Sequence, residues 1–288
     1  MDYEEFLRAV APELGLDWRK YRRRTSRRAV TARVAELGLS SLGEYRERVL
    51  GDPEEARGLP DRMRVTVSRF LREQSRWDAL FDRVIPELTA GRSRFRVWSA
   101  GCCGGEEPFT FSLLWRDRIA PSRPGLELSV LATDIDRPSL ERAARGVYGA
   151  GSLREVPTAL RASWFSAQGG RWLVSPAARG AVCFREHNLL EDAPPRGMDL
   201  VLCRYFVFTY FRGVRRAEAV RRLHGGLLPG GALVIGRKEG LTPDDGRFFE
   251  GWLGAEGVLA RRSWVRTTPG SGNLPPEVPD GPGRLPPG

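Results

Sequence analysis

A strand pattern, a glycine loop and a helix pattern follow one another between residues 95 and 115, and this stretch limits the possible folds most strongly. The apolar run ends at Gly101, and apolar residues return at helical spacing from Pro108 onward. This order is the opening unit of an α/β nucleotide-binding sheet. Glycines at 101, 104 and 105 allow backbone N–H groups to approach a ligand at the positive end of the helix. We therefore predict a doubly wound α/β fold.

The residues after the glycines indicate which ligand the loop binds. A phosphate-binding P-loop would continue with Lys and then Ser or Thr, whereas this chain continues with Glu106 and Glu107. Carboxylates repel phosphate, but they accept hydrogen bonds from hydroxyl groups and attract a cation. This chemistry fits a nucleoside that carries positive charge, such as the sulfonium of S-adenosylmethionine (SAM). In an alternative interpretation the loop is only a tight turn, which Cys102 and Cys103 fill as small residues.

A second apolar strand, at residues 126–132, leads to Asp134. In doubly wound folds an acidic residue at the tip of the second strand holds the two ribose hydroxyls. The distance of about thirty residues from the glycine loop fits one strand–helix–strand unit. Alternatively, an acidic residue here only caps the helix that begins at Pro138. The two roles are compatible, with Asp134 on the ribose and Asp136 as the cap.

The remaining apolar runs complete a mostly parallel, seven-stranded sheet. The run at 198–211 is continuous, as expected for a central parallel strand that is covered on both faces, and it includes Arg204, Tyr205 and Tyr210. Further strands are predicted at residues 181–184 and 232–236 and, as two short strands, within 247–267. We expect a small β insertion near 150–180.

The first 72 residues are expected to form a small, basic, all-helical N-terminal domain. The net charge of +10 comes almost wholly from arginine, which is densest at residues 19–34. One interpretation of this segment is a solvated helix face. The other is a docking surface for an acidic protein partner. The domain of the sheet would then occupy 73–267, and the Pro- and Gly-rich residues 268–288 would form a disordered tail.

Composition narrows the location and the partners. The chain contains no run of eighteen or more apolar residues and no secretory n- and h-region, so we expect a cytoplasmic protein without membrane insertion. Four cysteines without paired metal spacing fit a reducing compartment and predict no metal site. The N/D-P-P-Y/F motif of amino-methylating nucleic-acid enzymes is missing, so we expect no nucleic-acid partner. A monomer is expected.

Taken together, the motifs resemble those of the CheR family, the SAM-dependent methyltransferases that esterify glutamates of chemotaxis receptors. The resemblance covers roughly residues 15–266 and rests on WSAGCCGGEEPFT at 98–110, ATDID at 132–136, NL at 188–189 and CRYFVFTYF at 203–211. VTVSRFLRE and GRKEGL are similar to two further segments of the family. This sequence departs from the family at Tyr205, where the family has Asn, and by one extra residue before Tyr210.

The resemblance implies SAM as the cofactor, S-adenosylhomocysteine as the product, and a set of site residues. Arg72 and Tyr210 would lie beside the transferred methyl group and act in catalysis. The residues implied in cofactor binding are Thr66, Ser68, Arg72, Gly101, Glu106, Asp134, Asn188, Leu189, Arg204 and Tyr205. Among them, Glu106 and Asp134 would hold the nucleoside and the methionyl part, and Asn188 and Leu189 would frame the adenine.

A carboxylate acceptor explains how such a site could work without a general base. The carboxylate is already ionised near pH 7, so catalysis would depend on alignment and on the exclusion of water. Arg72 could orient the acceptor by a bidentate contact. Alternatively, Arg72 forms a structural salt bridge to Glu73 or Glu106.

Three functions remain open from the sequence. The first is transfer of a methyl group to a protein glutamate, with a receptor cytoplasmic region docking through 19–34. The second is a SAM methyltransferase with another acceptor, either a small molecule or another protein. The third is a signalling adaptor that binds SAM without catalysis.

Overall fold

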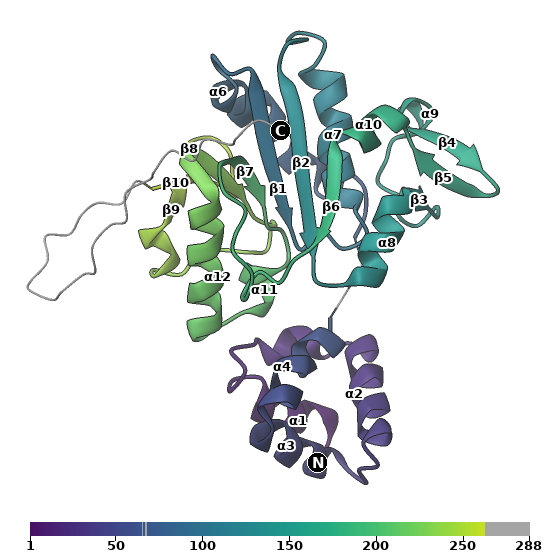
Figure 1. Ribbon diagram of the computed structural model, residues 1–288, viewed down its shortest axis with the longest axis vertical. Helices are drawn as coiled ribbons and strands as arrows, with labels where there is room; N and C mark the ends of the chain where they lie inside the picture. The colour runs from purple at the N-terminus through teal and green to yellow at the C-terminus, as the bar shows by residue number, and fades with distance from the viewer. Residues whose placement is uncertain (65, 67, 263–288) are drawn as a thin grey trace, which may run out of the picture.

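The structure is a computed structural model that describes residues 1–64, 66 and 68–262. An all-helical unit and an α/β unit are joined by the segment that follows residue 62 (Figure 1). The tail predicted at 268–288, and the part of the last strand prediction beyond residue 262, lie outside the described residues. The described part contains no helix that is long and apolar enough to cross a membrane.

The helical unit contains four helices around a small apolar core. They are α1 (Tyr3–Val10), α2 (Arg24–Glu36), α3 (Leu42–Gly51) and α4 (Pro53–Arg62). Phe6 and Tyr45 stack at the centre with a ring separation of 5.5 Å. The basic segment 19–34 is not one helix, because the 3-10 turn η1 (Trp18–Tyr21) and the extended Arg23 precede α2.

The large sheet has the strand order β6-β2-β1-β7-β8-β10-β9. The strands are β1 (Arg94–Ala100), β2 (Glu127–Asp134), β6 (Val182–Glu186), β7 (Met198–Leu202), β8 (Leu227–Val234), β9 (Phe249–Gly251) and β10 (Val258–Arg261). β6, β2, β1, β7 and β8 are parallel, and β10 pairs antiparallel with both β8 and β9. The prediction of a mostly parallel seven-stranded sheet is therefore confirmed.

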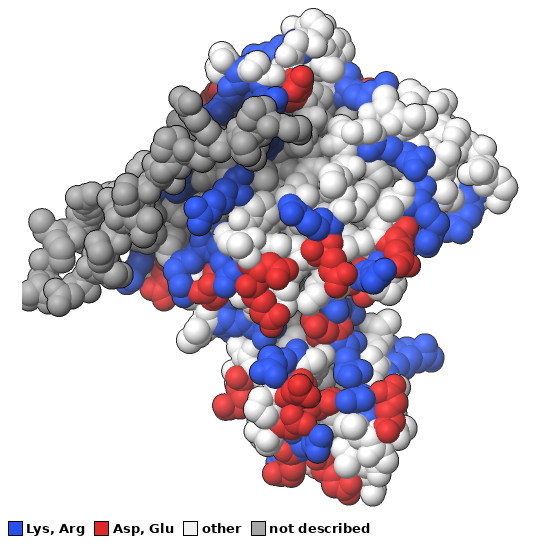
Figure 2. All heavy atoms as spheres, in the orientation of Figure 1, with Lys and Arg blue, Asp and Glu red and all other residues white. Residues whose placement is uncertain are grey.

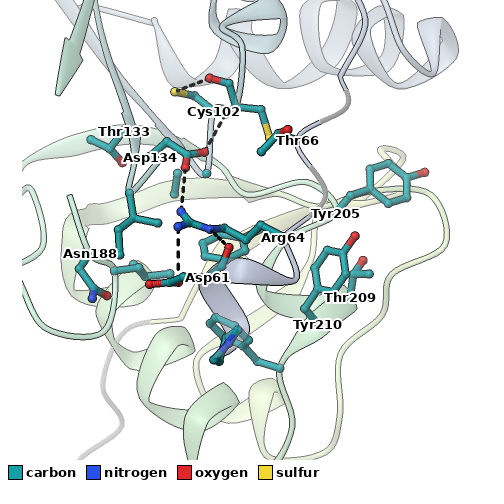
Figure 3. Close-up of a pocket in the computed structure, with 18 of the residues that line it drawn as sticks. Asp61, Arg64, Thr66, Cys102, Thr133, Asp134, Asn188, Tyr205, Thr209 and Tyr210 are labelled. Atoms are coloured by element: carbon teal, nitrogen blue, oxygen red, sulfur yellow. Dashed lines mark hydrogen bonds and ion pairs between the residues drawn. The ribbon is translucent and has the colours of Figure 1, made fainter. Parts of the chain in front are cut away.

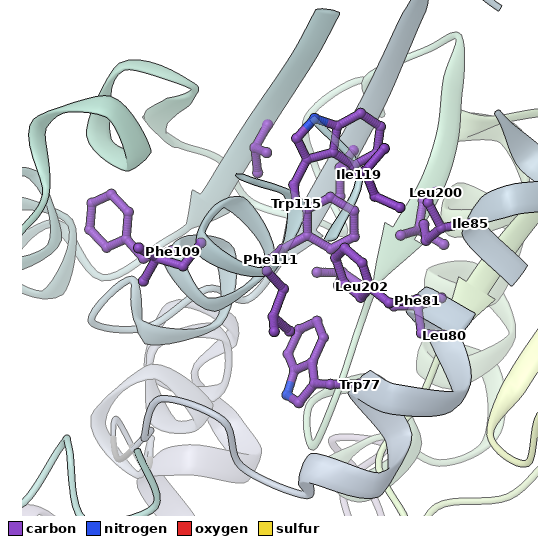
Figure 4. Packing of buried hydrophobic residues seen from close by; sticks show 14 of the residues in the cluster. Trp77, Leu80, Phe81, Ile85, Phe109, Phe111, Trp115, Ile119, Leu200 and Leu202 are labelled. Carbon is purple, nitrogen blue, oxygen red and sulfur yellow. The ribbon is translucent and has the colours of Figure 1, made fainter. Parts of the chain in front are cut away.

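Helices cover both faces of this sheet. Neighbouring strand residues point to opposite faces, and both faces carry apolar side chains that the helices bury. Val97 and Leu200 belong to one apolar core, together with residues of α5 (Gln74–Ala79), the π-helical turn η2 (Leu80–Val84), α6 (Ile85–Leu88) and α7 (Glu106–Arg118) (Figure 4). Trp98 and Val201 belong to the other core, with residues of α12 (Gly213–Gly226) and of the helical unit. α8 (Arg137–Arg145) follows β2.

The strand predicted at 198–211 is too long. β7 ends at Leu202, and the chain continues into the short helix α11 (Val207–Tyr210). Three residues beyond the end of β7, Tyr205 adopts a left-handed backbone with φ 58°, which does not continue a strand. The N–H of this residue donates to Glu239 Oε2 at 2.8 Å instead of to a neighbouring strand.

A second, three-stranded sheet lies between α8 and β6. It has the order β3-β5-β4 and consists of β3 (Val147–Tyr148), β4 (Phe165–Gln168) and β5 (Arg171–Val174). Along the chain, α9 (Thr158–Trp164) lies between β3 and β4, and α10 (Pro176–Gly180) follows β5. In Figure 1 this small sheet extends beyond α8, away from β8.

Candidate active site

A cavity of about 590 Å³ opens at the carboxyl ends of the parallel strands. From β1 the chain proceeds outward through β2 and β6, and then returns to β7 on the other side of β1. Such a reversal is where open α/β sheets bind ligands. The loops that follow β1, β2, β6 and β7 all supply lining residues (Figure 3).

The glycine loop enters the cavity at Gly101. The N–H groups of Gly101 and Cys102 both donate to the carbonyl of Thr133, at 2.8 and 2.9 Å, which binds the loop to β2. Gly101 has φ 75°, and a Cβ at this position would lie 2.7 Å from the ring of Phe206. A side chain at this position would therefore clash. The N–H of Gly101 is already bound to Thr133, and Gly104 and Gly105 do not line the cavity, so contact of these glycine N–H groups with a ligand stays a prediction.

Asp134 lies at the tip of β2, with 8% of its surface exposed. Its carboxylate accepts hydrogen bonds from the N–H groups of Cys103 and Asp136, at 2.8 and 2.9 Å. Arg64 Nη1 lies 3.9 Å from Oδ1 (Figure 3). Burial raises the pKa of Asp134. Asp136 accepts from the N–H of Ser139 at 3.0 Å and caps α8, so its predicted role is confirmed.

Glu106 and Glu107 lie in different environments, which corrects the expected position of Glu106. Glu107 lines the cavity, and Glu106 does not. Glu107 accepts from Ser99 Oγ at 2.9 Å, and its other oxygen lies 3.5 Å from Arg204 Nη1. Glu106 is buried and accepts from Ser152 Oγ at 3.2 Å, while its Oε2 has no hydrogen-bond partner among the described residues. Burial raises the pKa of both carboxyls.

The main chain of Arg72 is held by hydrogen bonds to its carbonyl and lies between two residues with unusual backbone conformations. Leu71 and Glu73, its two neighbours, both have left-handed backbones, with φ 54° and 63°. Its carbonyl accepts hydrogen bonds from Arg204 Nη2 at 2.7 Å and Trp77 Nε1 at 3.1 Å. Non-glycine residues with positive φ concentrate at functional sites, where the surrounding structure must hold them.

Among the described residues, the side chain of Arg72 has no acidic partner. Across residues 1–64, 66 and 68–262, its guanidinium makes no hydrogen bond or ion pair with the protein. Its Cζ instead lies 3.7 Å from the centroid of the Tyr205 ring. Glu73 pairs with Arg204 and Glu106 with Ser152, so the alternative of a structural salt bridge for Arg72 is excluded.

Two carboxylates hold the loop after β7. Sequence reasoning missed Glu239 and named Glu73 only as an alternative partner of Arg72. Glu73 accepts from Arg204 Nη2 at 2.9 Å, from the Tyr205 hydroxyl and from the Arg237 N–H at 3.2 Å. Burial raises the pKa of Glu73, but these hydrogen bonds outweigh it and the net shift is downward. Glu239 accepts from the N–H groups of Tyr205 and Gly236, at 2.8 and 2.7 Å. Arg204 and Tyr205 thus line the cavity while their polar groups bind neighbouring loops.

The other predicted residues also reach the cavity. Its lining includes Thr66, Ser68, Asn188, Leu189 and Tyr210. Asn188 closes a turn, because its Oδ1 accepts from the Leu190 N–H at 3.0 Å. The ring of Tyr210 lies 5.2 Å from the ring of Tyr21, and burial raises the pKa of Tyr210.

The helical unit forms one wall of the cavity, which sequence reasoning did not find. Its contribution comes from η1, from Arg23 and from α4 and the residues after it, and comprises Tyr21, Arg23, Arg57, Gly58, Pro60, Asp61 and Arg64. Arg23 belongs to the predicted docking segment 19–34, so this segment reaches the rim of the cavity. Among the described residues, no group of three or more His, Cys, Asp or Glu side chains could hold a metal ion.

Comparison with known proteins shows that both units match domains of the same family. Residues 1–63 match the CheR methyltransferase all-alpha domain, and residues 66–251 match the CheR methyltransferase SAM-binding domain. The chemotaxis protein methyltransferase of Listeria innocua is 32% identical over 246 residues, which cover 85% of this chain and 92% of that protein. Chemotaxis protein methyltransferase 1 of Pseudomonas aeruginosa is 33% identical over 219 residues, covering 73% of this chain and 79% of that protein. This chain is therefore a SAM-dependent methyltransferase and belongs to the CheR family.

Proposed function

We propose that this enzyme transfers the methyl group of SAM to a glutamate carboxylate in the cytoplasmic region of a chemotaxis receptor. The observation that carries the proposal is Arg72. Arg72 lines the cavity, and the N–H donors of its guanidinium are not used by any described protein group. A guanidinium with unused donors is a ready bidentate partner for an ionised carboxylate. The names of the relatives, and the family resemblance of the motifs, support a chemotaxis protein as the acceptor.

The cofactor would lie between the glycine loop and the loop after β6. Asp134 would accept hydrogen bonds from the ribose hydroxyls through the lone pairs that Cys103 and Asp136 leave free. Glu107, which lines the cavity, would face the cationic methionyl group in place of Glu106. Asn188 and Leu189 would frame the adenine. S-adenosylhomocysteine would keep these contacts as the product, and no step requires a metal.

The reaction would be an in-line displacement at the methyl carbon. A carboxylate oxygen of the acceptor forms a bond to the methyl carbon, and the bond from carbon to sulfur breaks with its electron pair on sulfur. The sulfonium becomes a neutral thioether, the carboxylate becomes a methyl ester, and no proton moves. Because a glutamate is ionised near pH 7, the protein contributes alignment, which supplies about 7–11 kcal/mol in well-oriented reactions. Arg72 would hold the carboxylate, and the Tyr210 hydroxyl would contact its second oxygen.

The acidic partner would dock on the basic segment 19–34. Arg24, Arg27 and Arg28 are exposed, and Figure 2 shows basic side chains across the helical unit below the cavity, interspersed with acidic ones. Arg23 connects this surface to the cavity rim. We place the enzyme in the cytoplasm because its proposed substrate is the cytoplasmic part of a receptor, and we propose that it acts as a monomer.

A methyl-transfer assay tests this proposal. The purified enzyme is incubated with methyl-labelled SAM and the purified cytoplasmic region of a chemotaxis receptor, and the product is treated with mild base. We expect the label to enter the receptor region and to leave it as methanol. A product that resists base would favour another acceptor. Tight binding of SAM without any transfer, either to this region or to other proteins, would favour the adaptor.

A further inference from the structure

Within the described part of the chain, the ring of Tyr205 is the one aromatic, hydrogen-bonding or charged group that contacts the guanidinium of Arg72. The Cζ of Arg72 is 3.7 Å from the ring centroid, which is the separation of stacked planes in van der Waals contact. The carbonyl of Arg72 is bound by Arg204 and Trp77, so its backbone is fixed independently. The Tyr205 ring therefore limits where the guanidinium end of the Arg72 side chain can lie.

The ring of Tyr205 is itself held from three directions. Its N–H donates to Glu239, and its hydroxyl donates to Glu73. On the side of Gly236 the ring is so close that a Cβ at that position would lie 2.7 Å from it. The ring thus has little freedom to move away from the guanidinium.

We propose that Tyr205 is the positioning residue that aims Arg72 at the acceptor carboxylate. This inference rests on the proposed function and deepens it, because it names the group that orients the acceptor-binding arginine. Tyr205 acts on the acceptor through Arg72 and takes no part in bond making.

The chemistry of the stack explains why an aromatic residue suits this position. A carboxylate beside Arg72 would accept from the same N–H donors that an acceptor needs. An aromatic face attracts the cation through its quadrupole and leaves the donors at the edge of the guanidinium unoccupied. Arg72 also has no structural ion pair with Glu73, the nearest carboxylate in sequence, because Glu73 is paired with Arg204.

The left-handed backbone of Tyr205 allows a test that separates stability from function. Asn is the non-glycine residue that best tolerates this conformation, so Tyr205→Asn removes the ring without adding backbone strain. Tyr205→Phe is the matched control, because it keeps the ring over Arg72 and removes only the hydroxyl that binds Glu73. Both variants are compared with the unmodified full-length chain by thermal unfolding and by calorimetric titration with SAM.

With the receptor cytoplasmic region as acceptor, we expect Tyr205→Asn to lower kcat/KM by about 5- to 30-fold, mainly through the acceptor KM. The dissociation constant of SAM should change far less, and Tyr205→Phe should retain most of the kcat/KM of the unmodified chain. Unchanged acceptor kinetics in Tyr205→Asn, or an equal loss in Tyr205→Phe, would overturn the inference.

A spectroscopic measurement judges the stack without any acceptor. In protein labelled with ¹⁵N-arginine, the Nε–H proton of Arg72 should be shifted upfield by the ring current. This signal is assigned by its loss in Arg72→Lys, and it should persist in Tyr205→Phe and move in Tyr205→Asn. An unshifted signal in the unmodified protein would overturn the inference. A shifted signal together with no base-labile transfer to the receptor region would uphold the stack and contradict the proposed function instead.

Discussion

Glu106 and Glu107 are neighbours in the first turn of α7, yet only Glu107 faces the cavity. Successive helical residues are separated by about 100° around the axis, so one side chain reaches the strand ends while the other points to Ser152. Glu107 is connected to Ser99 on β1 and to Arg204 after β7. Glu107 therefore lies between the ends of β1 and β7, where the strand order of the sheet reverses.

Neutralising each carboxylate separately tests which one serves the cofactor. Glu107→Gln should weaken SAM binding by about 1.5–3 kcal/mol, because it removes a charged acceptor from the cavity wall. Glu106→Gln keeps an oxygen that can accept from Ser152 and should change binding much less. Titration calorimetry with SAM measures both. A larger loss in Glu106→Gln would restore the carboxylate that the motif resemblance implies.

Asp134→Ala should weaken the binding of SAM and of S-adenosylhomocysteine by about 1–3 kcal/mol, because it removes the proposed ribose acceptors and orphans the N–H of Cys103. Asp136→Ala is the control. It removes the cap of α8 and should cost about 1 kcal/mol of stability, with little change in nucleoside affinity because this side chain does not line the cavity. Equal effects of the two substitutions on affinity would argue against a ribose contact at Asp134.

Arg72→Lys keeps the positive charge but loses the planar fork and its stacking on Tyr205. Turnover should fall more than tenfold, which corresponds to about 1.4 kcal/mol, while the dissociation constant of SAM should rise only modestly. Tyr210→Phe removes one hydroxyl contact and should cost less. Steady-state methyl transfer measured beside SAM titration separates the two parameters. A parallel loss of SAM affinity and turnover in Arg72→Lys would place Arg72 on the cofactor instead.

Charge reversal of the exposed face of α2 tests the docking surface. Arg24→Glu, Arg27→Glu and Arg28→Glu, combined in one chain, should weaken binding of the receptor region with marked salt dependence and spare SAM affinity. Arg23→Glu is examined separately, because Arg23 lines the cavity. Surface plasmon resonance at two salt concentrations provides the measurement. If the combined variant binds the receptor region as the unmodified chain does, the basic face is only solvated.

The helical unit should lose stability in acid through Glu55. Hydrogen bonds from Arg33 and Tyr45, led by that from Arg33, hold the pKa of this buried carboxyl below its ordinary value of 4.5. A group with a depressed pKa in the folded state stabilises it above the unfolded pKa, and this contribution is lost as the pH falls through the folded pKa. Glu55→Gln should therefore unfold at lower temperature at pH 7, and the difference from the unmodified chain should shrink below pH 4.5. A difference that stays constant down to pH 3 would show that the charge of Glu55 contributes nothing.

The strands β1 and β2 could be predicted because their apolar runs become buried toward the cavity and end at small or acidic residues. Helix α4 leaves an ambiguous signal in the sequence, because Asp52 and Pro53 are as typical of the residues after one helix as of the start of the next. In the structure Asp52 accepts from the N–H of Glu54 at 2.9 Å and Pro53 occupies the first turn, so the pair starts a new helix. The whole apolar run at 198–211 was predicted as strand because nothing in its local sequence marks an end at Leu202. The feature that ends the strand is the contact of Tyr205 with Glu239, which lies 34 residues further along the chain.

The site was predictable where one segment determines geometry and unpredictable where two segments meet. Gly101 and Asp134 follow from the loop and the strand tip that contain them. The choice between Glu106 and Glu107 depends on the rotation of α7 against the sheet, which sequence spacing does not give. The wall formed by Arg23 and Arg64 depends on how the helical unit packs against the α/β unit. Such tertiary contacts leave no local pattern in the sequence.

Tandem mass spectrometry of the receptor cytoplasmic region, after incubation with this enzyme and SAM, locates the transferred methyl group. We expect a methyl ester on the side chain of a glutamate, formed by the unmodified enzyme and strongly reduced in Arg72→Lys. A methyl group on a lysine, histidine or cysteine, or undiminished esterification by Arg72→Lys, would contradict transfer to a glutamate held by Arg72.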